Sequence, residues 1–337
     1  MPATVSFLVP LYNEATSVGP MLQSILQQKY GQDHLEVLIA MAPSDDGTEQ
    51  EVENFIHNHP TFKVQILPNP DRNTAVGRNL CLAHATGQFV INFSGHAIAE
   101  ADLVPVLLSK IENLPSEVIG IGCRIHAAES QTVMGRAIAT VLKSPLGGST
   151  WVDSSYHAKS DGPARSVAFT LYRRIPLEQL GGFDPNFWCG QDAELNLRLA
   201  RAGYRLWFTP DTGVEHRKRN RLSEFVFQSW QYGVARAKLV RKYPDSTRLL
   251  FVLPTIFLFV LIFAGVIALS SPTGAWAMAA TAMLFLVACS TCALFSGGSL
   301  PTVLMSPLLY GLLYVAYGIG FVCGLIESPA LQHNARS

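Results

Sequence analysis

The stretch from Gly190 to Leu195 carries two carboxylates, Asp192 and Glu194, directly before an apolar helical pattern. From Leu195 to Ala202, apolar side chains recur at spacings of three and four, which predicts one buried helix face. Both acids therefore lie at or just inside a helix start, where the macrodipole stabilises negative charge. Two such acids either stabilise the helix or belong to a reaction site, and the rest of the chain decides between these interpretations.

A second set of polar residues surrounds a buried strand. The apolar run Phe89–Phe93 predicts the strand, and Ser94-Gly95-His96 lies at its carboxyl end. Arg78 precedes it, in a stretch that is expected to be helical up to Gly87. A guanidinium at the edge of a sheet can bind a diphosphate through paired hydrogen bonds. A solvated surface arginine is the equally weighted alternative.

The elements that must position these residues follow from hydrophobic periodicity. Apolar runs predict strands at 5–9, 35–41, 64–67 and 89–93, and helical patterns occupy 17–28 and 49–57. Strands that alternate with helices at short spacing predict an α/β fold, with a parallel sheet covered by helices on both faces. Ligands of such sheets bind beyond the carboxyl ends of the strands. The loops Pro10–Glu14 and Pro43–Thr48 are therefore expected on one rim.

Charge is divided unevenly along the 337 residues, whose formal net charge is zero. Nearly every charged side chain lies in residues 1–248, whereas 249–326 contain no Asp, Glu, Lys or Arg, with Glu327 just beyond. This division predicts a water-exposed domain followed by membrane segments. Zero net charge disfavours a strongly nucleic-acid-binding protein. Val5–Val9 lacks the basic flank and the length of a signal peptide, so it is expected to be the first buried strand.

The six cysteines are scattered, and residues 1–248 show no metal-finger spacing. Cys289 and Cys292 form a C-x-x-C inside an apolar stretch without His or acidic neighbours. This context favours small membrane-helix residues over a redox or metal site. A reducing, cytosolic environment is expected for residues 1–248.

Three uncharged runs, 249–269, 276–295 and 303–326, reach the ~20 residues that cross a bilayer core. Cationic residues crowd the chain before Leu249, so the preceding domain is expected in the cytoplasm, on the inner (plasma) membrane. Three spans would leave the C-terminus outside. Pro307, Gly311, Gly318 and Gly320 interrupt the third run, for which a kinked span is favoured over a re-entrant one.

Residues 216–221 read His-Arg-Lys-Arg-Asn-Arg, and aromatic and cationic side chains follow as far as Lys242. Cationic residues interleaved with aromatics are found in nucleic-acid-binding segments and also at membrane surfaces. Next to a membrane span, the pattern favours an interfacial segment that binds anionic lipid headgroups and a lipid diphosphate.

Taken in order, these motifs resemble the family 2 glycosyltransferases, which have the GT-A fold. The motifs are VPLYNE at 9–14, DGT at 46–48, RN at 78–79, the triplet at 94–96 and QDAEL at 191–195. More narrowly, the chain resembles bacterial membrane glucosyltransferases of succinoglycan-type exopolysaccharide assembly, and residues 145–148, 169–174 and 228–233 extend the similarity. The resemblance covers residues 5 to about 245 and implies a Rossmann-like nucleotide-diphospho-sugar transferase domain.

The resemblance implies how the nucleotide sugar is held. Residues of the two rim loops match the nucleoside-binding positions: Pro10, Tyr12, Asn13, Glu14 and Asp46. Met41 stands where the family has an acid that contacts the base, and Asp45 is the substitute that the neighbouring turn offers. Arg78 and Ser94 are expected at the diphosphate.

The resemblance also implies a divalent cation, Mn²⁺ or Mg²⁺. The family binds it through a strand-end D-x-D or D-x-H motif, whose place is taken here by Ser94-Gly95-His96. Mg²⁺ prefers carboxylate oxygens, whereas imidazole suits Mn²⁺ or a softer metal. His96, with His216 at a late metal-binding position of the family, is therefore the expected ligand pair.

Asp192 matches the catalytic base of the family. Inversion at an anomeric carbon requires a carboxylate opposite the leaving diphosphate to accept the proton of the acceptor hydroxyl. Glu194 either orients the acceptor or caps the helix. Gln228 and Trp230 match a region that lies beside the acceptor site.

We therefore expect a cytoplasmic GT-A domain at 1–215, a basic amphipathic interfacial segment at 216–248, three transmembrane helices in 249–326 and a tail at 327–337. The expected function is inverting transfer of a hexose from a nucleotide sugar, expected to be UDP-linked, to a lipid-linked or polysaccharide-precursor acceptor. The alternative is a GT-A-fold binding or scaffold protein that has lost metal-dependent chemistry. Ser94 and Met41 favour this alternative, and Asp192 opposes it.

Overall fold

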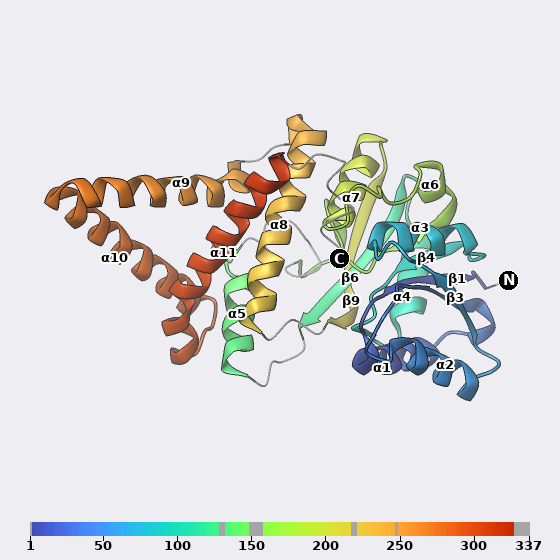
Figure 1. The fold of residues 1–337 in the computed structure, drawn as a ribbon. Coiled ribbons are helices and arrows are strands. Elements are labelled where there is room, and N and C mark those ends of the chain that lie inside the picture. Colours follow the sequence, from blue (N-terminus) through green and yellow to red (C-terminus); the bar gives the residue numbers. More distant parts are fainter. Residues whose placement is uncertain (1, 128–131, 148–157, 217–220, 247–248, 327–337) are drawn as a thin grey trace. The chain divides into compact units, whose positions relative to one another are not determined.

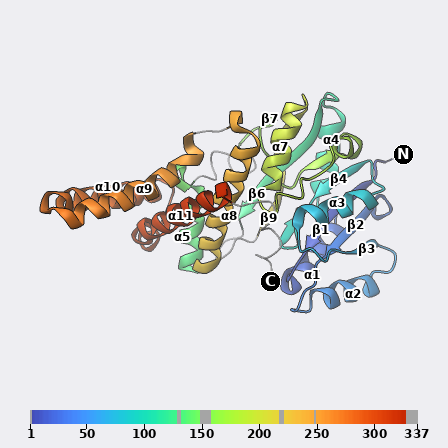
Figure 2. The same cartoon turned by 45° about the horizontal axis from the view of Figure 1, so that its top comes forward.

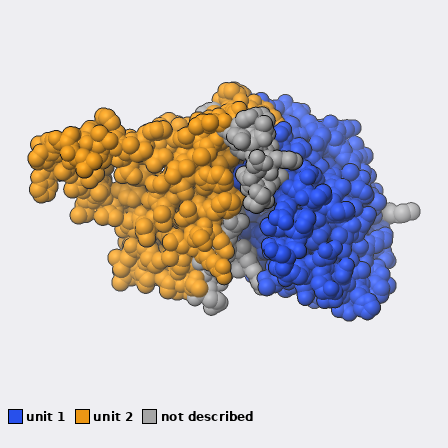
Figure 3. All heavy atoms as spheres, in the orientation of Figure 1, with its two compact units in different colours: residues 1–128, 152–217 blue, residues 129–151, 218–337 orange. Residues whose placement is uncertain are grey.

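The structure is a computed structural model and describes residues 2–127, 132–147, 158–216, 221–246 and 249–326. The chain divides into two compact units, coloured separately in Figure 3. The first consists of Met1–Ala128 and Val152–Arg217, and the second of Glu129–Trp151 and Lys218–Ser337.

The first unit is built on one mixed sheet of nine strands (Figures 1 and 2). Its strands are β1 (Val5–Leu11), β2 (Leu35–Met41), β3 (Lys63–Pro68), β4 (Phe89–Asn92), β5 (Ala97–Ala99), β6 (Val118–Ala127), β7 (Gly162–Ala164), β8 (Leu171–Arg173) and β9 (Arg205–His216). Its helices are α1 (Ala15–Leu26), α2 (Thr48–Asn58), α3 (Thr74–His84), α4 (Leu103–Glu112), α6 (Arg174–Gln179) and α7 (Gln191–Arg201), with the 3₁₀ turn η1 (Gln32–His34).

The strand order is β3-β2-β1-β4-β8-β6-β9-β5, with β7 paired to β9. β1, β2, β3 and β4 pair in parallel, so their carboxyl ends share one edge. β8 runs antiparallel to both β4 and β6, and β9 runs parallel to β6. The strands predicted from the first ninety residues are confirmed, and the antiparallel β8 makes the sheet mixed instead of wholly parallel.

β1 shows why both faces of this sheet are buried. Val5, Phe7, Val9 and Leu11 point into one core cluster, together with residues of α1, α2 and α4. Leu8, on the opposite face, packs into a second cluster with residues of α3, α6 and α7. Successive side chains of a strand alternate between faces, so a continuous apolar run fits a central parallel strand covered on both sides.

The second unit is helical. Its elements are α5 (Val133–Lys143), η2 (Pro145–Gly147), α8 (Leu222–Lys242), η5 (Pro244–Ser246), α9 (Leu249–Ser270), α10 (Pro272–Phe295) and α11 (Leu300–Ile326). By length and composition, α9 from Phe251, α10 and α11 are long and apolar enough to cross a membrane. The division into units places α5 here, within the range that the sequence assigned to the first domain, because Ala137, Ile138 and Val141 pack with Leu309 and Tyr310 of α11.

The start of α7, which carries Asp192, is fixed by a buried ion pair. Gly190 precedes the helix with a left-handed backbone, φ 70°. Glu194 is fully buried and accepts from Arg198 Nη2 at 2.9 Å, and Arg198 also donates to the carbonyl oxygens of Leu180 and Gly182. This arrangement ties the helix to the turn before it.

Replacing Glu194 by Ala leaves the Arg198 guanidinium without its buried partner. We expect the substitution to lower the stability of the chain by roughly 3–5 kcal/mol, the usual cost of breaking a buried pair. Thermal unfolding of the detergent-solubilised chain measures the change as a lower melting temperature. Glu178→Ala is the matched control, because Glu178 pairs with Arg174 at the same i,i+4 spacing on an exposed surface. Such exposed pairs contribute about 0.3–0.5 kcal/mol, so equal effects of the two substitutions would contradict the assignment.

Candidate active site

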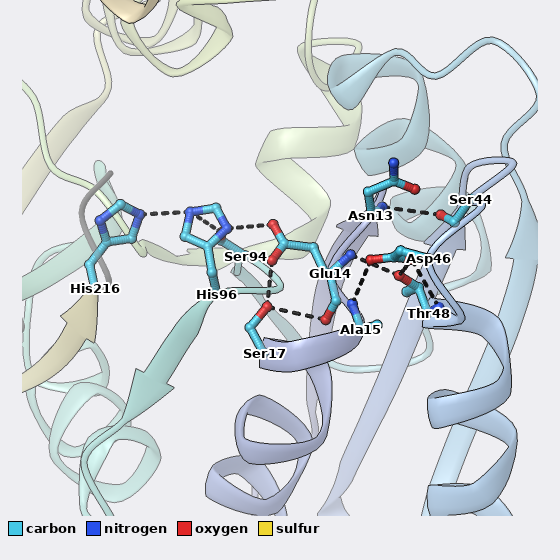
Figure 4. A network of polar contacts seen from close by, with 10 residues as sticks. All are labelled: Asn13, Glu14, Ala15, Ser17, Ser44, Asp46, Thr48, Ser94, His96 and His216. Atoms are coloured by element: carbon cyan, nitrogen blue, oxygen red, sulfur yellow. Dashed lines mark hydrogen bonds and ion pairs between the residues drawn. The ribbon is translucent and has the colours of Figure 1, made fainter. Parts of the chain in front are cut away.

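Asp46 joins the two rim loops at the starts of two helices (Figure 4). Its Oδ2 accepts from the backbone N–H of Ala15, the first residue of α1, at 3.0 Å. Its Oδ1 accepts from the backbone N–H and the hydroxyl of Thr48, the first residue of α2. The first N–H groups of a helix have no partner inside the helix, so one carboxylate satisfies a donor of each. These bonds lower the pKa of Asp46, first through the Thr48 hydroxyl and then through Ala15 N–H.

Asn13 and Asp45 make a second connection between the same loops. Asn13 Nδ2 donates to Asp45 Oδ1 at 2.8 Å, and the backbone N–H of Asp45 donates to Asn13 Oδ1 at 3.2 Å. The backbone N–H of Asn13 donates to Ser44 Oγ. Asn13 has a left-handed backbone, φ 52°, which asparagine adopts more readily than most residues. Both side chains thus shape the loops from outside the cavity described next.

A cavity of about 190 Å³ opens at the carboxyl edge of the parallel strands. Six of the residues expected to hold the nucleotide or the metal line it: Pro10, Tyr12, Glu14, Arg78, Ser94 and His96. The cavity lining does not include Asn13, Asp45, Asp46 or His216. The strand-end residues of β1, β3 and β4 therefore meet as the sheet topology predicts.

Sequence reasoning missed Arg72, which also lines this cavity. Its guanidinium lies over the Tyr12 ring, 5.0 Å from the centroid, a cation–π arrangement. Arg72 has a positive φ of 51°, which is uncommon for a residue with a side chain. The one available signal was its position in a polar turn directly after a predicted strand.

Glu14, His96 and His216 form a line of polar contacts on the other side of the cavity (Figure 4). Glu14 Oε1 lies 2.7 Å from His96 Nδ1, and His96 Nε2 lies 3.0 Å from His216 Nε2. Glu14 Oε2 also accepts from the Ser17 hydroxyl, and Ser94 Oγ lies 3.2 Å from His96 Nε2. The structure thus brings together the two histidines predicted as metal ligands, 120 residues apart in the sequence.

The spacing of these two nitrogens fits a bound cation. His96 Nε2 and His216 Nε2 lie 3.0 Å apart, close enough together for one cation to contact both nitrogens. Glu14 Oε1 can accept a hydrogen bond from Nδ1–H of His96, which leaves Nε2 without a proton and able to face a metal, as carboxylates behind metal-bound imidazoles commonly do. Imidazole donors suit Mn²⁺ better than Mg²⁺. Among the described residues, no group of three or more His, Cys, Asp and Glu is placed to hold a metal by itself.

Asp192 lies at the start of α7 and is held through one oxygen. Arg78 Nη1 donates to Asp192 Oδ1 at 2.8 Å, and Asn92 Nδ2 donates to the same oxygen at 2.9 Å. Arg78 is nearly buried, with its guanidinium over the Phe183 ring, whereas the Asp192 side chain is 39% exposed. Oδ2 of Asp192 has no hydrogen bond to any described residue.

The sequence did not predict the contacts of Arg78 and Asn92 with Asp192. Arg78 was expected at the diphosphate, and it lines the cavity while pairing with Asp192. Asn92 was not singled out, because an asparagine inside a buried strand carries no recognisable motif. Asn92 Oδ1 and Arg78 Nε are buried without a hydrogen-bond partner among the described residues. The two residues that hold Asp192 thus each keep one unused hydrogen-bonding atom.

Three residues that the sequence assigned to the acceptor, Glu194, Gln228 and Trp230, do not line the cavity. Glu194 is fully buried against Arg198, a position that favours a structural role over contact with an acceptor. The N-cap residue of α7 is Gly190, which makes no side-chain cap hydrogen bond, and a capping contact of Glu194 stays a prediction. Gln228 and Trp230 lie on α8 in the second unit, where Gln228 Nε2 donates to Tyr232 Oη, and their contact with an acceptor stays a prediction.

Protonation of Asp46 should weaken the connection between the loops. Its folded-state pKa is below the unfolded value of about 3.9, so its contribution to stability is complete above that value and disappears as the pH falls through the folded pKa. We expect Asp46→Asn to lower the melting temperature at pH 7, and the difference between variant and wild type to shrink as the pH falls below the unfolded pKa of about 3.9. Thermal unfolding between pH 7 and pH 3 tests this. Asp33→Asn, at an exposed turn, is the control, and a constant difference across the range for Asp46→Asn would contradict the expectation.

Comparison with known proteins identifies the family. The sequence model described as glycosyl transferase family 2 matches residues 6–180. The chain is 26% identical over 262 residues to a dolichyl N-acetyl-alpha-D-glucosaminyl phosphate 3-beta-D-2,3-diacetamido-2,3-dideoxy-beta-D-glucuronosyltransferase of Methanococcus voltae, covering 77% of this chain and 80% of the relative. It is 27% identical over 293 residues to the succinoglycan biosynthesis protein ExoA of Rhizobium meliloti, covering 81% and 82%.

Among solved structures, the fold is similar to that of the mannosyltransferase PcManGT from Pyrobaculum calidifontis in complex with GDP-Man and Mn²⁺. The TM-score is 0.59 at 20% identity, covering 96% of this chain and 88% of that chain. At this identity the likeness concerns the fold alone, and it confirms the predicted GT-A fold. Since the family model matches more than half of the residues, the chain belongs to glycosyl transferase family 2 and is a glycosyltransferase.

Proposed function

We propose that this enzyme transfers a hexose, with inversion, from a nucleotide sugar to a lipid-linked or polysaccharide-precursor acceptor at the cytoplasmic face of the inner membrane. The observation that carries the proposal is the carboxylate of Asp192, held through Oδ1 and open at Oδ2 beside a cavity at the strand ends. The relatives from Methanococcus voltae and Rhizobium meliloti, named for a dolichyl-phosphate-linked substrate and for succinoglycan biosynthesis, support such acceptors.

The cavity between the rim loops is proposed as the donor site. Tyr12 and Arg72 offer an aromatic face and a cation at its wall, a pair suited to a nucleobase and a phosphate. Arg78 adds a second, nearly buried cation. We propose a UDP-linked donor, and the GDP-Man in PcManGT makes a guanine nucleotide the first alternative to test.

Asp192 is proposed as the general base. As the acceptor oxygen bonds to the anomeric carbon and the bond to the diphosphate breaks, the acceptor proton moves to Oδ2 of Asp192. The nucleoside diphosphate leaves with the bonding electrons. Arg78 and Asn92 hold Oδ1 and thereby fix the direction of the Oδ2 lone pairs, which makes them positioning residues.

His96 and His216 are proposed to hold a divalent cation, for which Mn²⁺ fits the nitrogen donors best. The Mn²⁺ in PcManGT supports a cation in proteins of this fold. When bound, such an ion neutralises charge on the leaving diphosphate. Glu14 keeps His96 oriented with Nε2 toward His216, and Ser94 contributes a hydroxyl where a carboxylate is usual. That hydroxyl, together with Met41 at the place of the base-contacting acid, favours the scaffold alternative, in which the chain binds a nucleotide without transfer.

Removing the base should separate binding from transfer. We expect Asp192→Asn to reduce sugar transfer by about 10²–10⁴-fold, the usual contribution of a general base, while nucleotide affinity changes little. Transfer of labelled sugar to membrane lipid extract and calorimetric titration with UDP measure the two quantities. Unchanged transfer by the variant would remove Asp192 from the mechanism.

Asn92→Leu removes the donor to Oδ1 and keeps a side chain of similar size. We expect kcat to fall by about 10- to 100-fold, because small displacements of a reacting group cost this much, with the Kd for UDP unchanged since Asn92 does not line the cavity. Asn196→Leu, at another buried asparagine, is the matched control for packing. In the Asp192→Asn background the Asn92 substitution should have no further effect, and an additive loss would show that Asn92 does not act through Asp192.

Titration of UDP and GDP in the presence of Mn²⁺, Mg²⁺ or EDTA tests the metal site. We expect Mn²⁺ to strengthen nucleotide binding, and His216→Ala to abolish that gain while leaving the affinity in EDTA unchanged. Glu14→Gln should weaken Mn²⁺ binding by about 10- to 100-fold, as substitutions behind metal-bound histidines do. Nucleotide affinity that is the same with Mn²⁺ and with EDTA would contradict the site.

A further inference from the structure

We infer that the chain crosses the bilayer twice, through α9 and α10, and that α11 lies along the membrane surface instead of across it. The sequence alone favours three spans, because α11 is as long and as free of charge as the other two helices. Contacts within the second unit show that the surroundings of α11 differ from those of α9 and α10. The inference rests on the proposed membrane anchoring and concerns only the path of the chain.

The first observation is burial. In the most apolar stretch of each helix, 44% of the residues of α11 are buried inside the protein, against 6% in α9 and 11% in α10. Large apolar side chains of α9 such as Phe259 and Phe263 are mostly exposed, as helices surrounded by lipid require. α11 is instead a central packing element of the unit.

The second observation is the position along α11 at which α9 begins. A path of three spans requires α9 and α11 to cross in the same direction, since α10 returns the chain between them, and both would start on one side of the bilayer. In the structure the carbonyl oxygen of Phe251, in the first turn of α9, accepts from Tyr317 Oη at 2.9 Å, and the Phe257 ring packs against Tyr314.

Tyr317 lies 17 residues after Leu300, where α11 starts. At 1.5 Å per residue this is about 26 Å along the helix axis, close to the ~30 Å thickness of a hydrocarbon core. If α11 crossed the bilayer from the side on which α10 ends, the start of α9 would lie near the opposite side. α9 could not then begin on the side from which it must cross.

The third observation is the helix that covers α11. α8 and α11 run side by side, as both ribbon views show (Figures 1 and 2). Their backbones touch: a Cβ on Gly320 would lie 2.2 Å from the carbonyl oxygen of Trp230, and one on Gly233 would lie 2.1 Å from that of Tyr317. Further along, Arg241 Nη1 donates to the carbonyl oxygen of Gly324.

The covering helix is too polar for the hydrocarbon core. The last two turns of α8 carry Arg236, Lys238, Arg241 and Lys242. Each Lys or Arg at the centre of a membrane helix costs about 2.5–3.5 kcal/mol on insertion scales. α8 therefore belongs at the surface of the membrane, and α11, whose backbone it touches over several turns, lies there with it.

The exposed side of α11 fits lipid contact at that depth. Its large exposed side chains fall on one stripe of the helix: Leu300, Leu304, Leu308, Ile319, Leu325 and Ile326. A helix with one apolar stripe and a polar neighbour on another side matches the boundary between headgroups and acyl chains. α11 thus presents the stripe to the acyl chains, while α8 faces the headgroups.

The two paths differ in where the chain ends. With two spans, the C-terminus lies on the same side of the membrane as the α10–α11 turn, whereas three spans separate them. Cysteine labelling of the full chain in intact cells can decide, with the six native cysteines replaced by serine and UDP binding confirmed in that background. The probes are Ser270→Cys, Ser299→Cys and a cysteine appended after Ser337, reacted with a membrane-impermeant maleimide before and after permeabilisation.

We expect the Ser299→Cys probe and the C-terminal probe to react under the same condition, and the Ser270→Cys probe under the other. Reaction of the C-terminal probe together with Ser270→Cys would overturn the inference, whichever way the protein faces. Fusions of green fluorescent protein and alkaline phosphatase to the C-terminus of the chain with its native cysteines provide a second readout, since each is active on one side only. Release of the protein from membranes by alkaline carbonate would instead refute the anchoring itself.

Discussion

The parallel pairing of β1 with β2 and β4 is the constraint on which the site depends. Val5–Leu11 pairs in register with Leu35–Met41 on one side, and its first four residues, Val5–Leu8, pair with Phe89–Asn92 on the other, so the carboxyl ends of the three strands point to one edge. The loops that follow them must then meet. Because the loops meet, the single carboxylate of Asp46 accepts hydrogen bonds from the first backbone N–H groups of both α1 and α2. The contact between Glu14 and His96 lies beside it.

Beside this edge, two buried donors hold a partly exposed acid. Arg78 comes from α3, Asn92 from β4 and Asp192 from α7, and residues 78 and 192 are 114 positions apart. An exposed ion pair of this length would contribute little, but here the guanidinium is nearly buried and the carboxylate has one open oxygen. Charge and direction are therefore fixed together, which is what proton transfer from an incoming hydroxyl requires.

Much of the fold and part of the site could be predicted from the sequence, for identifiable physical reasons. The first four strands are strongly periodic or continuously apolar, and ordered motifs located Asp192, His96 and His216. The contact of Asn92 with Asp192 could not be predicted, because the two residues are 100 positions apart in the sequence and no motif links them. The burial of Glu194 could not be predicted either, since the sequence around an acid two residues beyond Asp192 does not indicate whether its side chain points inward. The close packing of α11 on α8 could not be predicted from hydropathy, because it is made at glycines such as Gly233 and Gly320.

Every residue that lines the donor cavity lies between Pro10 and His96, whereas the proposed base and the second histidine come from residues 192 and 216. In the proposed function, recognition of the nucleotide and chemistry on the sugar are thus encoded in separate halves of the first unit. Evolution can alter residues after about position 100, and with them the acceptor and the reaction, without changing any side chain that lines the donor cavity. During synthesis, the strand ends that line this cavity leave the ribosome well before the carboxylate proposed as the general base.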